Sequence, residues 1–334
     1  VLTSAVEDPE GSCSREGTPT NSARLMQLGT AARHDASLLR QPSLLRTSPA
    51  KKWTTWAMID ANYLHMFDCW AETFLSSQTQ QPIHVSCLDF TTLVHVDAWK
   101  LALGTAGLEV SSGEVPQAEG TAFLQTGEDM QASMPKKSYV KQYYPELQAL
   151  LQKTGGDVLH SDTDAMWLGS PDSLLNDVLK NFPDADLVSS RHREPVPMVA
   201  LKAWGFVVNT GFTLFRHTEA MHELLQEISS SVSDLDDQSH LHLALLKRGC
   251  SWQTKENLED AYSPKEHHGG DEAFLIGRCG NLRLVLLPPA QISRAAAWNH
   301  ESFDSSKVLV WHPDLPGSNA SDRLDIFRSA NVCT

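Results

Sequence analysis

The chain has 334 residues, of which 41% are hydrophobic and 20% charged, a composition typical of a globular protein with one large domain or two small ones. Its formal net charge of −14 repels polyphosphate backbones, which argues against nucleic-acid binding. No stretch reaches the roughly 18 apolar residues that a membrane span requires. The sequence therefore predicts a folded protein with no nucleic-acid partner and no membrane span of its own.

Residues 1–50 are rich in Ser, Thr, Gly, Pro and Arg and show no sustained apolar period. This composition predicts a flexible stem or tail, followed by one folded domain at 51–334. The chain starts at Val1 with neither a signal peptide nor an initiator methionine, which leaves a membrane anchor upstream of this sequence open.

Apolar periodicity predicts strands and helices in turn along the folded part. The predicted strands cover residues 54–59, 83–89, 157–161, 185–189, 204–215 (two strands or one bent strand), 282–287 and 307–311. The predicted helices cover residues 63–76, 94–104, 139–153, 174–181, 218–232 and 236–249, and loops are expected at 107–133 and 251–270. This alternation predicts an α/β fold with an open, mostly parallel sheet and helices on both faces. Ligands bind such sheets outside the carboxyl ends of the strands.

Two carboxylates follow the apolar strand at 157–161, in the sequence Asp162-Thr163-Asp164. In an extended chain both would face the same side, where two like charges are unfavourable without a cation. Oxygen ligands suit Mg²⁺ or Mn²⁺, which in turn bind a diphosphate. The alternative is a surface turn that merely contains two acids.

A DxD motif also occurs in phosphatases of the haloacid-dehalogenase type, in which the first Asp is the nucleophile. Those enzymes need a later GDxxxD-like element, and here residues 270–275 lack its second Asp. The motif also lies near the middle of the chain and not after the first strand. Both observations make a phosphatase the weaker alternative.

Three further polar elements interrupt apolar surroundings. Asn209-Thr210-Gly211 lies inside an apolar tract, where its polar groups need partners and Gly211 permits close approach of a ligand. Asp236, Asp237 and Gln238 stand at a predicted helix start, where helix capping is the alternative explanation. His312 follows the last predicted strand and can join two carboxylates on Mn²⁺, although a lone His is more often structural.

The six cysteines form no CxxC pair, so a zinc site is not supported. Their loose spacing leaves buried thiols and disulfides both open. One sequon, Asn319-Ala320-Ser321, accepts a glycan only in a secretory lumen. Neither feature by itself fixes the compartment.

In their order along the chain, these elements resemble the nucleotide-diphospho-sugar transferases, and among them glycosyltransferase family 77. That family includes rhamnogalacturonan xylosyltransferases and extensin arabinosyltransferases. Its pattern runs from a Lys at a helix, through DxDxxW with a nearby Pro, to Asn-Thr-Gly, Asp-Gln and a late His. The matching residues are Lys137 before the helix at 139–153, Asp162, Asp164, Trp167 and Pro171, Asn209 to Gly211, Asp237 with Gln238, and His312. The resemblance covers roughly residues 53–328.

The resemblance implies a GT-A fold, a Rossmann-like open mixed sheet, and a divalent cation, Mn²⁺ or Mg²⁺, on Asp162, Asp164 and His312. It also implies roles in substrate binding and catalysis. The substrate-binding residues would be Asn62 near the base and ribose, Lys137 near the diphosphate, Asp162, Thr210, Gly211 and Arg323. The catalytic residues would be Asp237, Gln238 and Asn209. Arg323 departs from the family pattern, which places a basic residue soon after the late His, and it would take that residue's place on the diphosphate.

The implied reaction is retaining transfer of a pentose or galactose from a nucleoside-diphosphate donor, UDP-linked, to a hydroxyl of a glycan or glycoprotein. We expect front-face attack, with double displacement through Asp237 as the alternative. The implied location is the Golgi or secretory lumen, with the cytoplasm as the alternative. Two other functional classes remain open: a DxD-dependent phosphatase or nucleotide-sugar hydrolase, and a non-catalytic carbohydrate-binding relative.

Overall fold

The structure is a computed structural model that describes residues 53–79, 81–105, 110–112, 136–192, 197–231, 235–254, 274–295, 308–315 and 318–333. The predicted stem at 1–50 and most of the two predicted loops lie outside these residues. Within the described part, no helix combines the length and the apolar character needed to cross a membrane.

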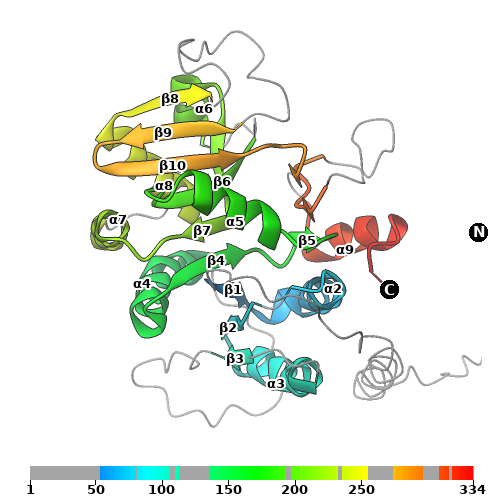
Figure 1. The fold of residues 1–334 in the computed structure, drawn as a ribbon. Coiled ribbons are helices and arrows are strands. Elements are labelled where there is room, and N and C mark those ends of the chain that lie inside the picture. Colours follow the sequence, from blue (N-terminus) through cyan, green and yellow to red (C-terminus); the bar gives the residue numbers. More distant parts are fainter. Residues whose placement is uncertain are drawn as a thin grey trace, which may run out of the picture. The chain divides into compact units, whose positions relative to one another are not determined.

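A nine-stranded sheet in the order β3-β2-β1-β4-β7-β6-β10-β9-β8 forms the centre of the described domain (Figure 1). Seven of the strands run in one direction, and only β7 and β9 run antiparallel to their neighbours. The strands are β1 (Trp53–Ile59), β2 (Ile83–Cys87), β3 (Val110–Ser112), β4 (Asp157–Ser161), β6 (Leu187–His192), β7 (Val207–Phe215), β8 (Cys250–Thr254), β9 (Leu275–Cys279) and β10 (Leu282–Leu287). The predicted open, mostly parallel sheet is confirmed.

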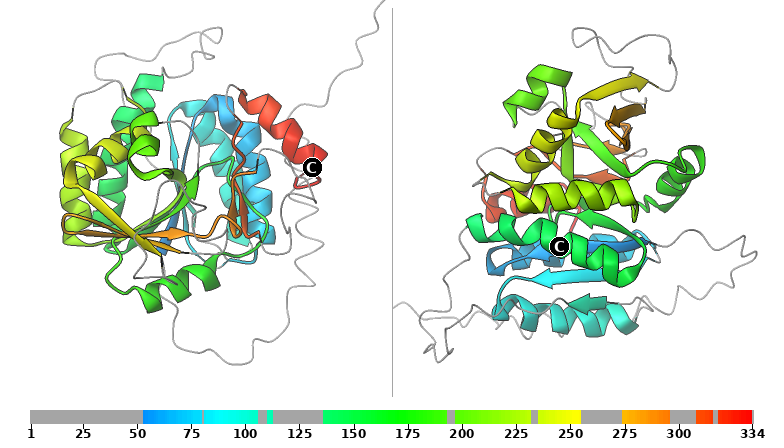
Figure 2. Two further views of the ribbon diagram at one scale, coloured as in Figure 1. Left: turned by 90° about the horizontal axis from the view of Figure 1, so that it is seen from above. Right: turned by 90° about the vertical axis from the view of Figure 1, so that its left-hand side faces the viewer.

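Helices pack on both faces of this sheet. The helices are α2 (Leu64–Ser76), α3 (Phe90–Thr105), α4 (Lys136–Thr154), α5 (Asp172–Asn181), α6 (Met198–Trp204), α7 (Glu219–Ser230), α8 (Asp237–Arg248) and α9 (Ala320–Ser329), with a short 3-10 helix η1 (Ala61–Tyr63) before α2. Figure 2 shows α5 on one face and the group α4, α7 and α8 on the other. The core between that group and the sheet contains Tyr143, Leu147, Phe215, Leu224 and Leu241, all buried.

Several element boundaries differ from the prediction. The strand expected at 204–215 starts only at Val207, because residues 198–204 form α6, which ends at Gly205 in the left-handed conformation (φ 78°). The loop expected at 107–133 contains the short edge strand β3, and the loop expected at 251–270 begins with most of β8. Strand β9 and helix α9 were not predicted, because neither has a long run of residues at one clear period.

A second, three-stranded sheet in the order β11-β12-β5 brings the C-terminal part of the chain to the DxD motif. Its strands are β5 (Met166–Trp167), β11 (Ile292–Ser293) and β12 (Val310–Trp311). Trp311 of β12 pairs with Met166 of β5 in antiparallel register. The residue after Trp311, which is His312, therefore lies opposite the end of the acidic motif.

Two disulfides join elements that are distant in sequence. Cys69 of α2 is bonded to Cys333 just beyond α9, and Cys250 of β8 is bonded to Cys279 of β9. Cys87 is a buried free thiol whose pKa is raised to about 12 by burial and by nearby carboxylates. The described cysteines thus include both disulfides and a buried free thiol, the two alternatives that the sequence spacing had left open.

Peptide mapping of the non-reduced protein should recover the Cys69–Cys333 and Cys250–Cys279 crosslinks, with Cys87 alkylated only after denaturation because it is buried. The bonds close loops with sequence separations of 264 and 29 residues. Reduction should therefore lower the free energy of unfolding by about 4 kcal/mol for the shorter loop and about 6 kcal/mol for the longer one on the chain-entropy model. Alkylation of Cys69 or Cys250 in the native, non-reduced protein would contradict this pairing.

Candidate metal and donor site

The acidic motif forms a turn at the carboxyl end of β4. The chain leaves the strand at Asp162 and turns back at once, because the Ala165 amide donates a 3.0 Å hydrogen bond to the Asp162 carbonyl. The expectation of an extended motif is therefore wrong, although the two carboxylates still converge. Ser161, the last residue of β4, fixes the start of the turn, because its hydroxyl accepts hydrogen bonds from the indole N–H groups of Trp70 (3.0 Å) and Trp167 (3.1 Å).

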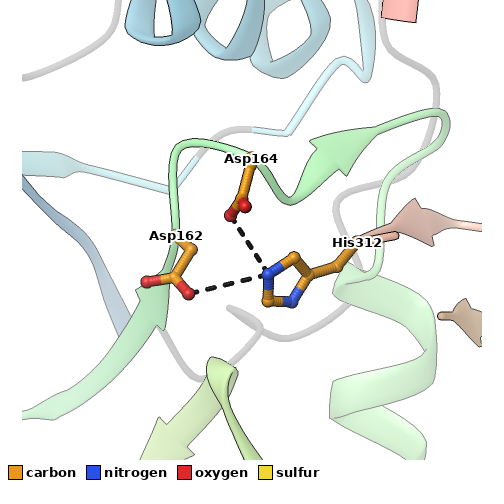
Figure 3. A group of neighbouring side chains, drawn as sticks. All are labelled: Asp162, Asp164 and His312. Atoms are coloured by element: carbon orange, nitrogen blue, oxygen red, sulfur yellow. Dashed lines mark ion pairs between the residues drawn. The ribbon is translucent and has the colours of Figure 1, made fainter. Parts of the chain in front are cut away.

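Asp162, Asp164 and His312 converge on one point (Figure 3). Their candidate ligand atoms all lie within 4.8 Å of one another. The Nε2 atom of His312 lies 3.0 Å from Asp164 Oδ1 and 3.6 Å from Asp162 Oδ2. Neighbouring ligands of an octahedral ion with bonds of about 2.1 Å lie about 3 Å apart, so this spacing fits a small divalent cation.

Asn209 determines which nitrogen of His312 faces the carboxylates. The Asn209 side-chain oxygen accepts the Gly211 amide at 3.0 Å, so that atom must be the oxygen. The same oxygen lies 3.2 Å from His312 Nδ1, which therefore carries the proton. The other nitrogen, Nε2, faces the two carboxylates, and a cation that replaces its proton would take the Nε2 lone pair, an arrangement typical of histidine ligands that a neighbouring group orients.

His160 orients Asp162 in a similar way. It lies two residues earlier on β4, on the same face of the strand, and is 1% exposed. Its Nε2–H donates a 2.9 Å hydrogen bond to Asp162 Oδ1, and its ring packs against those of Trp56 and Tyr143, which also contact each other. Asp162 Oδ2 is thereby directed towards His312.

A bulge in β7 carries the Asn-Thr-Gly element into the site. Ser189 of β6 pairs with Thr213 but Ser190 pairs with Asn209, so residues 210–212 are extra on β7. The displaced Asn209 carbonyl accepts hydrogen bonds from the hydroxyls of Ser189 (2.5 Å) and Thr213 (2.8 Å). These hydroxyls satisfy a buried acceptor that the strand ladder leaves unpaired, which removes the expected cost of a polar group in this tract.

Gly211 lies directly against the candidate metal ligands. Its carbonyl accepts the Asp162 amide at 2.8 Å. A Cβ atom at this position would clash with the His312 ring and with Asp162 Oδ2. In the structure it is therefore the side chains of His312 and Asp162 that approach Gly211 closely, whereas the predicted approach of a bound substrate to Gly211 stays a prediction.

Asp236 and Asp237 have different roles at the start of α8. Asp236 caps the helix, accepting the Ser239 amide at 2.6 Å, as the capping alternative predicted. Asp237 instead accepts a 2.8 Å hydrogen bond from the Thr210 hydroxyl. Gln238 lies beside it, with its side-chain oxygen 3.4 Å from the Thr210 amide and 3.5 Å from Asn209 Nδ2.

The carboxyl pKa values at the site diverge. Burial raises the pKa of Asp237 to about 6, the negative charge of Asp162 adds to the shift, and the Thr210 hydrogen bond opposes it. Burial would also raise the pKa of Asp164, but the charges of His312, Arg323 and Arg294 hold it well below its usual range. The pKa of Asp162 is likewise lowered against burial, by His160 and His312.

Arg323 reaches the same place from the first turn of α9. Its guanidinium Nη1 is paired with Asp164 Oδ2, and its Nε donates a 3.1 Å hydrogen bond to the Ser318 hydroxyl. Tyr63 also borders the site, because the charges of Asp164 and Asp162 add to burial in raising its pKa. The structure thus brings Arg323 to the acidic motif.

For two other predicted substrate-binding residues, Asn62 and Lys137, the structure gives no contact with the acidic motif among the described residues. Asn62 is exposed in η1 after β1, and its amide donates to the side chain of Asp60, the cap of that turn. Lys137 was expected before its helix but lies within α4, whose first turns have no described side chains. The sequence reasoning missed His160 and Tyr63, although the alternation of a strand could have revealed His160.

These residues fit a divalent cation of the Mg²⁺ or Mn²⁺ kind. Two carboxylates and one imidazole, each positioned by a neighbour, form a donor set that suits such ions. Three protein ligands leave further positions for water or substrate oxygens. The cluster stands at the carboxyl edge of the adjacent parallel strands β1 and β4, where α/β sheets bind ligands.

The fold and the site together define a GT-A type of protein, with an open α/β sheet and an acidic metal-capable turn at its carboxyl edge. The sequence profile of nucleotide-diphospho-sugar transferases matches residues 127–304, which is 178 of the 334 residues. The chain belongs to this family of glycosyltransferases, as predicted. No curated protein sequence matches it.

Several solved structures are similar at low identity. The glycosyltransferase GlyE of Streptococcus pneumoniae is 12% identical (TM-score 0.44; 84% of this chain and 64% of that one). The mannosyltransferase PcManGT of Pyrobaculum calidifontis, in complex with GDP-Man and Mn²⁺, is 14% identical (0.34; 66% and 60%). Mouse xyloside xylosyltransferase 1 is 15% identical (0.40; 59% and 82%). The chain spans less than two thirds of the first two proteins.

Gly211→Ala should disrupt the ligand cluster, because the new methyl group displaces His312 and Asp162. We expect Mn²⁺ affinity to fall by about tenfold or more. The free energy of unfolding should fall by about 1–3 kcal/mol. Calorimetric titration and chemical denaturation measure the two effects. Gly156→Ala is the control, since its Cβ meets nothing closer than 3.9 Å. Equal Mn²⁺ affinity in the two variants would contradict the close packing at Gly211.

The raised pKa of Asp237 predicts a pH-dependent stability. The folded chain holds this proton more tightly than the unfolded chain, so wild type loses stability as pH rises from about 4 to about 6. Asp237→Asn cannot ionise and avoids that loss. In a chelator, its stability relative to wild type should be greater at pH 7.5 than at pH 4 by on the order of 2 kcal/mol. Asp325→Asn, at an exposed position on α9, is the control. A pH-independent difference for Asp237→Asn would refute the prediction.

Proposed function

We propose that the protein is a metal-dependent glycosyltransferase that moves a sugar from a UDP-linked donor to a hydroxyl of a glycan or glycoprotein, with retention of anomeric configuration. The observation that carries this proposal is the convergence of Asp162, Asp164 and His312 at the carboxyl edge of the sheet, in a chain of the nucleotide-diphospho-sugar transferase family. The narrower likeness to family 77, and with it a pentose or galactose donor, remains a prediction.

The proposed cofactor is Mn²⁺, with Mg²⁺ as the alternative. When bound, such an ion offsets the negative charge that develops on the leaving diphosphate. Asp162, Asp164 and His312 would hold it, because each directs one lone pair to the same point. His160 and Asn209 would keep those lone pairs in place, since their hydrogen bonds occupy the opposite side of Asp162 and His312.

The sugar would lie over the β7 bulge, between the metal ligands and the start of α8. Support comes from the side chains that meet there: Thr210 contacts Asp237, and Gln238 approaches both Asn209 and Thr210. These groups offer hydrogen-bond donors and acceptors to sugar hydroxyls. Because Asn209 and Thr210 are almost fully buried, we assign direct contact with the sugar chiefly to Asp237 and Gln238.

Retention would follow from attack on the face that the leaving diphosphate vacates. In this route Gln238 and Asp237 orient the sugar and the side chains exclude water. In the alternative, the Asp237 carboxylate attacks the anomeric carbon as its bond to the nucleoside diphosphate breaks, and the acceptor hydroxyl then displaces Asp237 and gives its proton to the released diphosphate. Asp237 would need to be ionised for that step, and its pKa of about 6 permits this at neutral pH.

A secretory location, in the Golgi or another lumen, fits the two disulfides, because such bonds persist in oxidising compartments. The exposed sequon at Asn319 is compatible with the same location. We propose that residues 1–50 serve as a stem there.

A screen of nucleotide-sugars by thermal shift and donor hydrolysis tests the proposal. One UDP-sugar should raise the melting temperature in Mn²⁺ and not in a chelator, because a ligand that binds the folded state stabilises it. Asp164→Ala should abolish the shift and reduce transfer by about 100-fold or more, as expected for a removed metal ligand. Asp325→Asn should behave as wild type.

The same screen separates the other functional classes. Rapid phosphate release from phosphomonoesters, without dependence on an acceptor, would favour a phosphatase that uses Asp162 as nucleophile. Donor binding unaffected by Mn²⁺ would favour a non-catalytic carbohydrate-binding relative. Transfer with inversion of configuration would leave the glycosyltransferase class standing but remove the retaining mechanism.

A further inference from the structure

Arg323 and a divalent cation share one carboxylate. Asp164 is 5% exposed, and both of its oxygens are engaged: Oδ1 lies 3.0 Å from His312 Nε2, and Oδ2 is paired with the Arg323 guanidinium. A buried carboxylate needs such a counter-charge, because an unpaired one is costly. Arg323 therefore supplies the positive charge that a metal ion would otherwise supply.

A metal ion on Asp164 meets this guanidinium at close range. A cation bound by Oδ1 and His312 Nε2 stands on the same carboxylate as Arg323, and two positive charges there repel each other. The guanidinium also draws electron density from the ligand. Without a diphosphate, a metal ion on Oδ1 and Arg323 on Oδ2 would each weaken the hold of the other on Asp164.

The Arg323 side chain can leave Asp164 without movement of its helix. Its other hydrogen bonds, to the Ser318 hydroxyl (3.1 Å) and the Leu315 carbonyl (3.5 Å), tie it to the loop between His312 and α9. The Arg323 side chain is 23% exposed, so part of it already borders solvent. The helix itself is fixed to α2 by the Cys69–Cys333 disulfide.

We propose that Arg323 acts as an exchangeable counter-ion: it neutralises Asp164 when no donor is bound, and it transfers to the donor diphosphate when metal and nucleotide enter together. A diphosphate brings negative charge that both the metal and a bidentate guanidinium can neutralise. Arg323 thus opposes binding of free metal and favours binding of the metal–nucleotide pair. This inference rests on the proposed function and adds the order in which the site fills.

The proposal makes predictions of opposite sign for one substitution. Without nucleotide, Arg323→Ala should bind Mn²⁺ about tenfold more tightly than wild type, since a charge-assisted competitor is gone. With saturating Mn²⁺, the same variant should bind UDP about tenfold more weakly, since the diphosphate loses its partner. A residue with a purely structural role would weaken both. Arg323→Lys, which keeps the charge but loses the bidentate geometry, should fall between wild type and Arg323→Ala in both titrations.

Titration calorimetry with Mn²⁺ alone, and with UDP in Mn²⁺, measures both affinities. Arg328→Ala is a matched control that removes the same charge from the same helix. The Arg328 side chain is 41% exposed and lies 4.0 Å from Asp325 in an ion pair on α9 itself. It should change neither affinity by more than about twofold, as expected for a weak surface pair.

The outcomes separate this inference from the proposed function. Unchanged or weaker Mn²⁺ binding by Arg323→Ala, in a protein whose wild type binds Mn²⁺ and whose Asp164→Asn variant does not, would overturn the counter-ion role and leave the metal site standing. Failure of both wild type and Arg323→Ala to bind Mn²⁺ would remove the proposed function and this inference together. If Arg323→Ala bound Mn²⁺ more tightly but UDP as well as wild type does, the proposed transfer of Arg323 to the diphosphate would be overturned.

Discussion

The repulsion between two carboxylates at the end of β4 is the constraint on which the rest of the site depends. Asp162 and Asp164 are two residues apart in one turn, and Asp237 adds a third negative charge close by. Holding them together requires compensation from every side. His160 provides it for Asp162, and His312 with Arg323 for Asp164. His160 lies two residues before Asp162 on the same strand, whereas His312 and Arg323 come from the C-terminal part of the chain, which the fold brings to the acidic turn.

The small sheet β11-β12-β5 performs that task for His312. Strand β5 starts directly after the acidic turn, and its two-residue pairing with β12 sets the register that places His312 opposite the turn. The β7 bulge supplies the other side, where Asn209 holds the imidazole and Gly211 leaves space for it. The placement of His312 thus depends on strands of only two residues. Trp167 and Trp311 of these strands are fully buried, so side-chain packing adds to their hydrogen bonds.

Sequence patterns predicted the longer helices and strands, because each has enough residues to show an apolar period or a terminating glycine. Residues 157–161 are all buried and form β4 as expected, and α8 ends at Gly249 in the left-handed conformation that glycine favours. The strand predicted at 307–311 includes β12, whereas β5 could not be placed, because a period cannot be read from two residues. Helix α6 was not predicted, and only its last residue, Trp204, fell within the predicted strand, since Met198 to Trp204 is a short apolar run whose end is marked by Gly205 alone.

The sequence predicted which residues form the candidate site better than it predicted the contacts among them. A DxD motif, an Asn-Thr-Gly element and a late His can be found by residue type, and the structure does bring them together. What each side chain touches depends on register and rotamer: Asn209 faces His312 because a three-residue bulge turns it there, and no one-dimensional pattern specifies such a bulge. The disulfide partners were equally hidden, as the 264-residue separation of Cys69 and Cys333 gives no spacing signal.

That disulfide gives the C-terminal helix a role beyond stability. Helix α9 is short, and its N-terminal capping box, with Asn319 and Asp322, fixes its start but not its place. Isolated helices of this length are marginal in water. Contact with α2, closed by Cys69–Cys333, holds α9 where Arg323 reaches Asp164. A guanidinium on a frayed terminus would sample many positions, whereas one on a tethered helix moves only between two neighbouring anions. The covalent link therefore makes the exchange of Arg323 between carboxylate and diphosphate a local rotation, so the entropy of ordering the terminus does not have to be overcome when the donor binds.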